Sequence, residues 1–264
     1  MVHEILHPLS GRKPRYALFD FDGTVSLLRE GWQGIMYRYF TEVLSAIPGQ
    51  AASEETLREV VMDFVDRLTG KQTIFQAMRL AEEIEKRGGK PCDPGIYKAE
   101  YLRRLMEQIH HRHEALRRGA DPEPYLVPGT KAFLSFLQSQ GMVCYLASGT
   151  DETDVLAEVE LLGLTPYFSG IYGAEETDRT ACSKEKVLKN LFQRHDLRGD
   201  DLISFGDGYV EIELTKQVGG YAVGVASDES SRSGKPDAWK RKRLLEAGAD
   251  AIWPDFSDGW TFFE

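Results

Sequence analysis

Short apolar runs, rich in β-branched and aromatic residues, recur along the chain and predict buried strands. Nearly continuous apolar runs of this length are typical of strands covered on both faces. The predicted strands are YALFDF at 16–21, VCYLAS at 143–148, FSGIYG at 168–173, LISFGD at 202–207, YAVGVA at 221–226 and AIWP at 251–254. From residue 128 onward, amphipathic helical patterns alternate with them. This alternation predicts an α/β protein with a Rossmann-like parallel sheet and helices on its faces.

Residues 27–125 interrupt this alternation with helical periodicity and without a convincing strand pattern. The segment ends in GADPEPYLVPGT at 119–130, whose three prolines suit a linker that returns to the sheet. We therefore predict an α/β core domain made of residues 1–26 and 126–264, and an inserted α-helical domain at 27–125.

Composition narrows the class of protein. The chain has 264 residues, 42% hydrophobic and 28% charged, which is enough for a core domain and an insert. Because the net charge is -10, we expect no nucleic acid as a partner. The first fourteen residues contain no continuous apolar run and no stretch of about 18 apolar residues occurs, so we expect no membrane contact and a cytoplasmic location. Cys92, Cys144 and Cys182 lack the spacing of a zinc site or a disulfide framework.

Acidic and hydroxyl side chains follow several of the predicted strands. Asp20 and Asp22 end the first strand, Ser148 ends the second, and Asp207 follows a later one. We expect these groups to converge, because ligands of open parallel sheets bind at the carboxyl ends of the strands. Clustered carboxylates repel one another unless a cation neutralises them, and an all-oxygen donor set favours Mg²⁺. Since bound Mg²⁺ shares phosphate oxygens, a small phosphorylated metabolite is the expected partner.

The two aspartates of the first strand end suggest a division of chemical work. An aspartate can attack phosphorus and form an aspartyl-phosphate, which is the role we assign to Asp20. Asp22 would then protonate the leaving oxygen and later activate water. Gly23 permits a tight turn in which backbone N–H groups approach the phosphoryl oxygens. We place Thr24 in the same substrate-binding loop, where it is expected to cap or orient the loop.

Four motifs, in this order, resemble those of the haloacid dehalogenase-like hydrolases. They are DFDGT at 20–24, LASGT at 146–150, a lysine opening a helix in CSKEKVL, and ISFGDGYVE at 203–211. The resemblance covers about residues 15–27 and 128–255. In position and helical character, the insert is similar to the cap of the phosphoglycolate phosphatase and β-phosphoglucomutase branch.

This resemblance implies a role for each matching residue. It makes Asp20 the nucleophile, Asp22 the general acid and base, Ser148 a phosphoryl hydrogen-bond donor beside Gly149, and Lys184 a cationic clamp. The implied Mg²⁺ ligands are Asp20, Asp22 through its backbone carbonyl, Asp207 and Glu211. The family usually has aspartate at the last position, so Glu211 either holds the metal through water or orients Lys184. Lys186 is the alternative clamp.

Substrate specificity is expected to reside in the insert, because a cap that closes over the site contacts the leaving group and excludes water. Arg29 and Trp32, just after the first loop, and Lys71 in the TGKQT turn at 69–73 are the candidate substrate-binding residues.

The favoured function is a Mg²⁺-dependent phosphatase that hydrolyses a small phosphorylated metabolite through an aspartyl-phosphate. The alternatives are a phosphomutase, a phosphonate hydrolase in which Lys71 forms a Schiff base, and a non-catalytic phosphometabolite-binding protein. The presence of both the nucleophile and the metal-binding acid favours an enzyme. The sequence leaves the substrate open, and a monomer or a homodimer is equally compatible with it.

Overall fold

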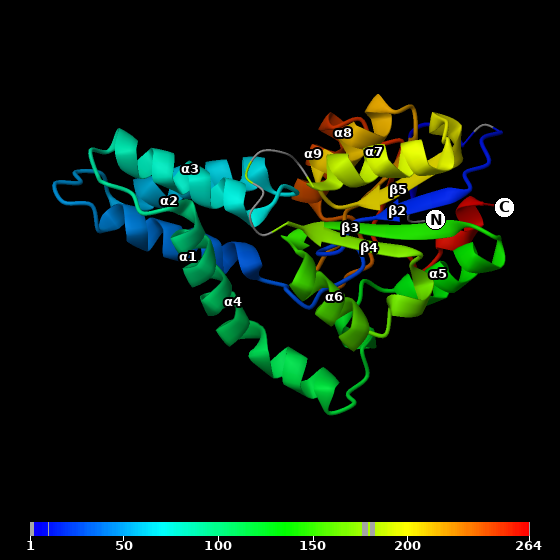
Figure 1. The fold of residues 1–264 in the computed structure, drawn as a ribbon, viewed down its shortest axis with the longest axis horizontal. Helices are drawn as coiled ribbons and strands as arrows, with labels where there is room; N and C mark the ends of the chain where they lie inside the picture. Colours follow the sequence, from blue (N-terminus) through cyan, green and yellow to red (C-terminus); the bar gives the residue numbers. More distant parts are fainter. Residues whose placement is uncertain (1–2, 10, 176–178, 180–182, 264) are drawn as a thin grey trace. The chain divides into compact units, whose positions relative to one another are not determined.

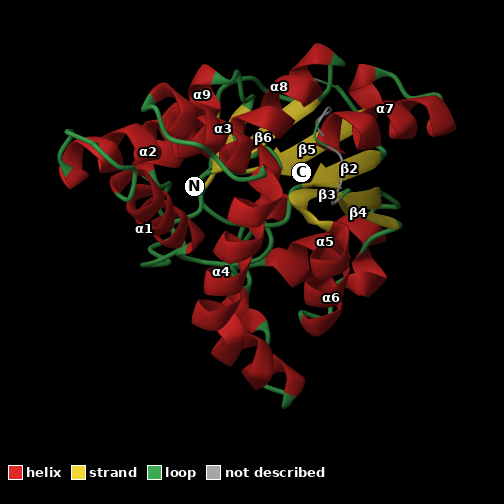
Figure 2. Ribbon diagram, turned by 60° about the vertical axis from the view of Figure 1, so that its left-hand side comes forward, coloured by secondary structure: helices red, strands yellow, loops and turns green. Residues whose placement is uncertain are grey.

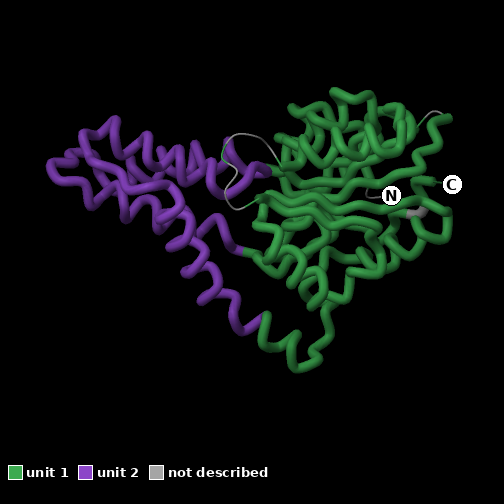
Figure 3. Tube along the Cα trace, viewed as in Figure 1, with its two compact units in different colours: residues 1–30, 113–264 green, residues 31–112 purple. Residues whose placement is uncertain are grey.

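The chain forms two compact units (Figure 3). The structure, a computed structural model, describes residues 3–9, 11–175, 179 and 183–263. Unit 1 comprises Met1–Glu30 and His113–Glu264, and unit 2 comprises Gly31–Arg112. Unit 2 is therefore shorter than the predicted insert of 27–125. The flanking residues belong to unit 1 because Leu27, Leu28 and Leu116 are buried in its hydrophobic core.

Unit 1 contains a sheet of seven strands within the described residues, in the order β1-β7-β6-β5-β2-β3-β4. Neighbouring strands from β7 to β4 pair in parallel, and β1 pairs antiparallel with β7 at one edge. This confirms the predicted α/β class. The sequence did not predict β1, which is too short for an alternating pattern. The strands are β1 Glu4–Ile5, β2 Tyr16–Phe19, β3 Val143–Asp151, β4 Gly170–Ala174, β5 Leu202–Gly206, β6 Tyr221–Val225 and β7 Ala251–Trp253.

Helices cover both faces of this sheet (Figures 1 and 2). Helices α5 and α6 lie on one face, and α7, α8 and α9 lie on the other. The alternation of β2 explains this arrangement, since Ala17 and Phe19 join the core under α5 and α6 while Leu18 packs with α7. The helices of unit 1 are α5 Thr130–Ser139, α6 Glu152–Leu161, α7 Ser183–His195, α8 Tyr209–Gln217 and α9 Ala238–Glu246. Short 3₁₀ helices occur at Glu123–Tyr125, Thr165–Tyr167, Gly199–Asp201 and Gly259–Phe262.

The topology places the candidate site at the end of β2. From this central strand the chain proceeds to β3 and β4 on one side, then returns to β5, β6 and β7 on the other. The carboxyl ends of strands at such a reversal form the ligand-binding crevice of open α/β sheets. Asp20 follows β2 directly, and its backbone N–H donates to the carbonyl of Phe205 on β5 at 2.9 Å. Asp207 follows β5 in the same way.

Unit 2 consists of helices and turns, and all of its residues are described. Its own hydrophobic core includes Phe40, Val61, Leu80 and Ile109 and shares no residue with the cores of unit 1. The helices are α1 Trp32–Ser45, α2 Glu54–Leu68, α3 Thr73–Lys86 and α4 Pro94–Arg117. Because α4 continues past Arg112, its last residues belong to unit 1.

Two further sequence expectations can be compared with the structure. Within the part of the chain that the structure describes, no helix combines the length and apolarity needed to cross a membrane. Cys92 and Cys144 are free thiols, whereas Cys182 lies outside the described residues.

Candidate active site

The loop after β2 brings Asp20 against Asp207 through a glycine. Gly23 has a φ of 74°, in the left-handed region that glycine adopts without steric cost. A Cβ at this position would lie 2.2 Å from Oδ2 of Asp207. Glycine therefore adopts this turn without strain and leaves the space that the Asp207 carboxylate occupies.

Thr24 is a buried residue that holds the β2 loop against the end of β5. Its side chain is fully buried, and its Oγ1 accepts a hydrogen bond from the backbone N–H of Asp207 at 3.0 Å. The buried hydroxyl thus ties the β2 loop to the end of β5. The sequence places Thr24 in the substrate-binding loop with an orienting role; its burial and this hydrogen bond agree with the orienting role, and substrate contact stays a prediction.

Lys184, at the start of α7, is held between two carboxylates. Its Nζ lies 2.7 Å from Oδ1 of Asp20 and 2.9 Å from Oε2 of Glu211, and the side chain is 4% exposed. Burial alone would lower the pKa of Lys184, but Asp20 and Glu211 outweigh it and hold this pKa above the usual range of lysine. Burial raises the pKa of Asp20, an effect that the Lys184 ammonium opposes. Lys186 is exposed and lies on another part of the helix surface.

Glu211 is a buried residue of α8 with both oxygens engaged. Oε2 accepts from Lys184, and Oε1 accepts from the backbone N–H of Gly208 at 2.7 Å. A Cβ at Gly206 would lie 2.1 Å from Cγ of Glu211, so a glycine at the end of β5 gives this side chain its space. The geometry supports the interpretation in which Glu211 orients Lys184.

The carboxylates of this cluster have the chemistry of a Mg²⁺ site. Asp20, Asp207 and Glu211 each offer an oxygen, and these three oxygens lie within 4.8 Å of one another. Mg²⁺ prefers such hard oxygen ligands and completes its shell with water and phosphate oxygens. The residues present therefore fit the metal that the sequence suggested.

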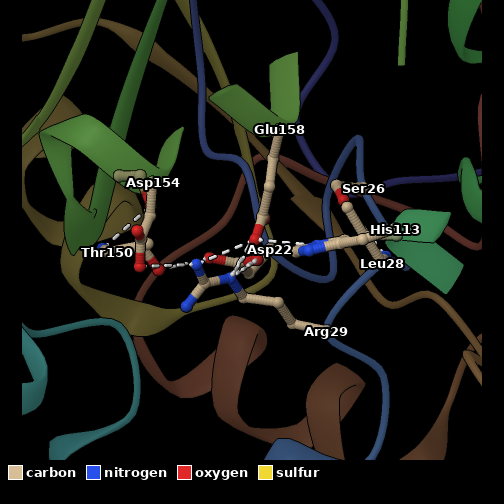
Figure 4. A network of polar contacts seen from close by, with 9 residues as sticks. Asp22, Ser26, Leu28, Arg29, His113, Thr150, Asp154 and Glu158 are labelled. Carbon is tan, nitrogen blue, oxygen red and sulfur yellow. Dashed lines mark hydrogen bonds and ion pairs between the residues drawn. The ribbon is translucent and has the colours of Figure 1, made fainter. Parts of the chain in front are cut away.

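Asp22 lies beside this cluster in a different environment (Figure 4). Thr150 Oγ1 donates to its Oδ2 at 2.7 Å, while Nε of Arg29 is 3.9 Å from its Oδ1. Burial raises the pKa of Asp22 to about 6, and Arg29 opposes this shift. A carboxyl with a pKa near neutrality can both give and take a proton, which a general acid and base must do.

Ser148 closes the site from β3. Its Oγ accepts a hydrogen bond from the backbone N–H of Thr150 at 3.0 Å, which leaves the hydroxyl proton available for another acceptor. Its carbonyl accepts from Ser183 Oγ, at the start of α7, at 3.3 Å. Ser148 is buried, and the adjacent Gly149 is half-buried.

The predicted substrate-binding residues of the insert occupy three different environments. Arg29 belongs to unit 1, is 5% exposed and is bound by Glu158 and Asp154, which corrects its expected place in the cap. Trp32 packs partly buried against the core of unit 2. Lys71 is half-buried in the turn between α2 and α3. For all three residues, substrate contact stays a prediction.

Sequence reasoning missed Lys240. This residue of α9 is 7% exposed, and its Nζ lies 2.8 Å from Oδ2 of Asp207 and 2.6 Å from Oε1 of Glu229. Nζ also donates to Oγ of Ser227 at 2.9 Å, and that hydroxyl donates to the carbonyl of Gly23 at 2.5 Å. The available signal was that the polar loop 227–237 begins at a strand end. Nothing in the sequence indicated that Lys240 would reach back to it.

Fold and site together define an α/β protein whose central strand leads into an acidic site that contains a buried lysine. A family model described as haloacid dehalogenase-like hydrolase matches residues 14–219, so the chain belongs to this family. This confirms the resemblance that the sequence motifs suggested. No curated protein matches the chain in sequence.

Solved structures with the same fold cover nearly the whole chain. A predicted phosphoglycolate phosphatase from Haemophilus somnus 129pt has a TM-score of 0.61 at 17% identity, over 95% of this chain and 98% of that one. β-Phosphoglucomutase from Clostridium difficile has a TM-score of 0.61 at 13% identity, over 93% and 92%. CbbY from Rhodobacter sphaeroides, in complex with phosphate, has a TM-score of 0.57 at 16% identity, over 93% and 96%. At these identities the likeness shows the fold.

Proposed function

We propose that the protein is a Mg²⁺-dependent phosphatase that hydrolyses a small phosphorylated metabolite through an aspartyl-phosphate on Asp20. The observation that carries the proposal is the pairing of two unlike carboxyls on one loop. The Lys184 ammonium lies 2.7 Å from Oδ1 of Asp20. Asp22 is hydrogen-bonded by Thr150, and burial raises its pKa to about 6. The first suits a nucleophile, and the second suits a proton donor and acceptor.

In the first step, an oxygen of Asp20 attacks phosphorus. The new Asp20–phosphorus bond forms as the ester bond to the substrate oxygen breaks, and Asp22 gives its proton to that leaving oxygen. In the second step, Asp22 takes a proton from water, the water oxygen bonds to phosphorus, and the Asp20 carboxylate is released with inorganic phosphate. The two steps return both carboxyls to their starting states.

The remaining residues stabilise charge and hold geometry. The Lys184 ammonium faces Asp20 and would bind an equatorial phosphoryl oxygen, to which the Ser148 hydroxyl would donate a hydrogen bond. Mg²⁺ would be held by Asp20, Asp207 and the carbonyl of Asp22, with Glu211 behind them, and it neutralises phosphoryl charge when bound. Preorganised donors of this kind supply much of the rate enhancement in phosphoryl transfer.

The substrate class rests on the family and on the chemistry of the site. A CbbY mutant from Rhodobacter sphaeroides, which shares the fold, was solved in complex with xylulose-(1,5)bisphosphate. By analogy we assign to this chain a small phosphorylated molecule, with Trp32 and Lys71 of unit 2 as candidates for contacting its leaving group. A cytoplasmic location is part of the same proposal.

The deciding experiment measures phosphate release from p-nitrophenyl phosphate and a panel of phosphorylated metabolites, in Mg²⁺ and in EDTA. The variant Asp20→Asn is nearly isosteric but removes the nucleophilic oxygen, so we expect at least a ~10³-fold loss of kcat with the fold retained. Glu160→Gln, a change of an exposed carboxylate on α6, is the matched control and should behave as wild type.

Circular dichroism and thermal unfolding would establish that the Asp20→Asn variant is folded. Substantial turnover by that folded variant would remove Asp20 from the nucleophilic role. Release that persists in EDTA would refute the dependence on Mg²⁺.

A further inference from the structure

One buried carboxylate of unit 1 contacts a residue beside each of the two points where the chain passes between the units. The chain leaves unit 1 after Glu30 and re-enters it at His113. Arg29 precedes the first crossing, and His113 follows the second. Both side chains contact Glu158 of α6 (Figure 4): an Arg29 guanidinium nitrogen is 2.8 Å from Oε1 of Glu158, and Nε2 of His113 is 3.3 Å from the same oxygen.

Glu158 is held in its charged form by these partners. The side chain is 2% exposed, and burial alone would raise its pKa. Arg29 and His113 outweigh that effect and lower the pKa of Glu158. A buried carboxylate is tolerated only when it is paired and hydrogen-bonded in this way.

The same arginine faces Asp22 but does not bind it closely. Nε of Arg29 lies 3.0 Å from both oxygens of Glu158, and another of its nitrogens lies 3.0 Å from Oδ2 of Asp154. From Oδ1 of Asp22, the same Nε is 3.9 Å away. Among the described residues, none donates a hydrogen bond to this Oδ1, although the oxygen is buried.

This unequal sharing has a chemical consequence. Three carboxylates surround one guanidinium, and the close contacts go to Glu158 and Asp154. Asp22 therefore keeps one oxygen free of a hydrogen-bond donor, while Thr150 fixes the other at 2.7 Å. A general acid needs such an oxygen, because the proton that it gives to the leaving group must reside on it.

We propose that Glu158 is a positioning residue that draws Arg29 away from Asp22, so that no guanidinium N–H occupies Oδ1 of Asp22 and this oxygen can carry the proton for the leaving group. The inference rests on the phosphatase function proposed above. Without the Glu158 charge, the Arg29 guanidinium turns to Asp22, closes the 3.9 Å gap and occupies this oxygen with a hydrogen bond.

Leaving-group dependence separates this role from a merely structural one. p-Nitrophenyl phosphate releases a stable phenolate that needs little protonation, whereas benzyl phosphate, of similar size, releases a poor leaving group that depends on the general acid. We compare kcat/KM, which reports steps up to phosphoryl transfer. Glu158→Gln should lower kcat/KM for benzyl phosphate by ~10²-fold, the usual worth of a general acid, and for p-nitrophenyl phosphate by less than ~5-fold.

A double variant tests the cause. Arg29→Met combined with Glu158→Gln removes the guanidinium that would occupy Asp22, so kcat/KM for benzyl phosphate should return to within ~10-fold of wild type. It also removes the buried charge of Glu158 together with that of its partner Arg29, which proteins tolerate better than the loss of one partner. Glu160→Gln, on the exposed face of the same helix, is the matched control and should leave kcat/KM unchanged for both substrates.

Three results would overturn the inference. The first is an equal loss of kcat/KM for the two substrates in Glu158→Gln. The second is a double variant whose kcat/KM for benzyl phosphate is no higher than that of Glu158→Gln. The third is a Glu158→Asp variant in which kcat/KM for p-nitrophenyl phosphate, divided by that for benzyl phosphate, is unchanged. Glu158→Asp keeps the buried charge, which favours a folded protein, but shortens the side chain by one methylene. The kcat/KM for p-nitrophenyl phosphate, divided by that for benzyl phosphate, should therefore rise ~10-fold. Wild-type protein that releases phosphate neither from these two esters nor from the panel of phosphorylated metabolites would instead refute the proposed phosphatase function.

Discussion

The burial of Asp22, the proposed general acid and base, costs stability. Burial raises its folded-state pKa to about 6 from an ordinary value of 3.8. Below pH 3.8 the carboxyl is neutral in both the folded and the unfolded chain. Between pH 3.8 and about 6, a rise in pH ionises the carboxyl of the unfolded chain before that of the folded chain, so the free energy of unfolding falls until both are charged.

Replacing Asp22 by asparagine should reverse this penalty. We expect Asp22→Asn to be more stable than wild type by roughly 3 kcal/mol at about pH 8 and close to wild type near pH 4. The measurement is urea unfolding of both proteins across this pH range, with Glu160→Gln as the control at an exposed carboxylate. A stability difference that does not vary with pH would show that burial of the Asp22 charge is not its cause.

At the scale of elements, the first turn of α9 does more than cover the sheet. Asp237 caps this helix, and its side chain accepts from the backbone N–H of Lys240 at 2.8 Å. The cap fixes the first turn, from which the Lys240 ammonium reaches Asp207 and Glu229. Burial alone would lower the pKa of Lys240, but these two carboxylates hold it above the usual range of lysine. A short helix thus supplies a second internal cation beside the candidate metal ligands.

Removing this cation should change how the protein responds to Mg²⁺. Lys240→Met leaves Asp207 and Glu229 without their ammonium, which should destabilise the metal-free protein by about 3 kcal/mol. Mg²⁺ should then restore more stability than it adds to wild type, because it neutralises the same carboxylates. Thermal unfolding in EDTA and in MgCl₂ measures both effects, with exposed Lys242→Met as the control. An equal Mg²⁺-dependent gain in variant and wild type would contradict this reasoning.

At the scale of the whole molecule, the two units have separate hydrophobic cores. The core of unit 2 contains Leu80, which is fully buried, and none of its residues belongs to the cores of unit 1. Local stability in proteins follows such cooperative units. A defect in the core of unit 2 should therefore loosen that unit first.

We expect Leu80→Ala to lower the stability of unit 2 by about 3 kcal/mol through the cavity it leaves. Hydrogen exchange should quicken in α1 to α3, while the amides of β2 and β5 keep their protection. Leu156→Ala removes a leucine that is 45% exposed and serves as the control. Equal loosening of α1 to α3 and of β2 would show that the molecule unfolds as one cooperative unit.

The sequence by itself determined the parallel α/β sheet and the residues at its strand ends. Continuous apolar runs and helical periodicity are local properties, and the end of a parallel strand is a shared location whatever surrounds it. Asp20, Asp22, Ser148 and Asp207 can therefore be assigned to one edge of the sheet from the sequence alone. The boundaries of the insert were less accessible, because Leu27 and Leu116 pack by tertiary contact with unit 1.

Only the tertiary structure decided which charges meet. Arg29 and Glu158 are 129 residues apart in the chain, and no local pattern indicates that they pair. Likewise, Lys240 has the sequence pattern of a solvated helix residue, and only the packing of α9 beside the loop after β6 buries it. Periodicity reports whether a position faces inward, whereas the partner of a buried charge depends on how distant elements dock. The catalytic candidates could thus be predicted from the sequence, whereas the residues that hold them in place could not.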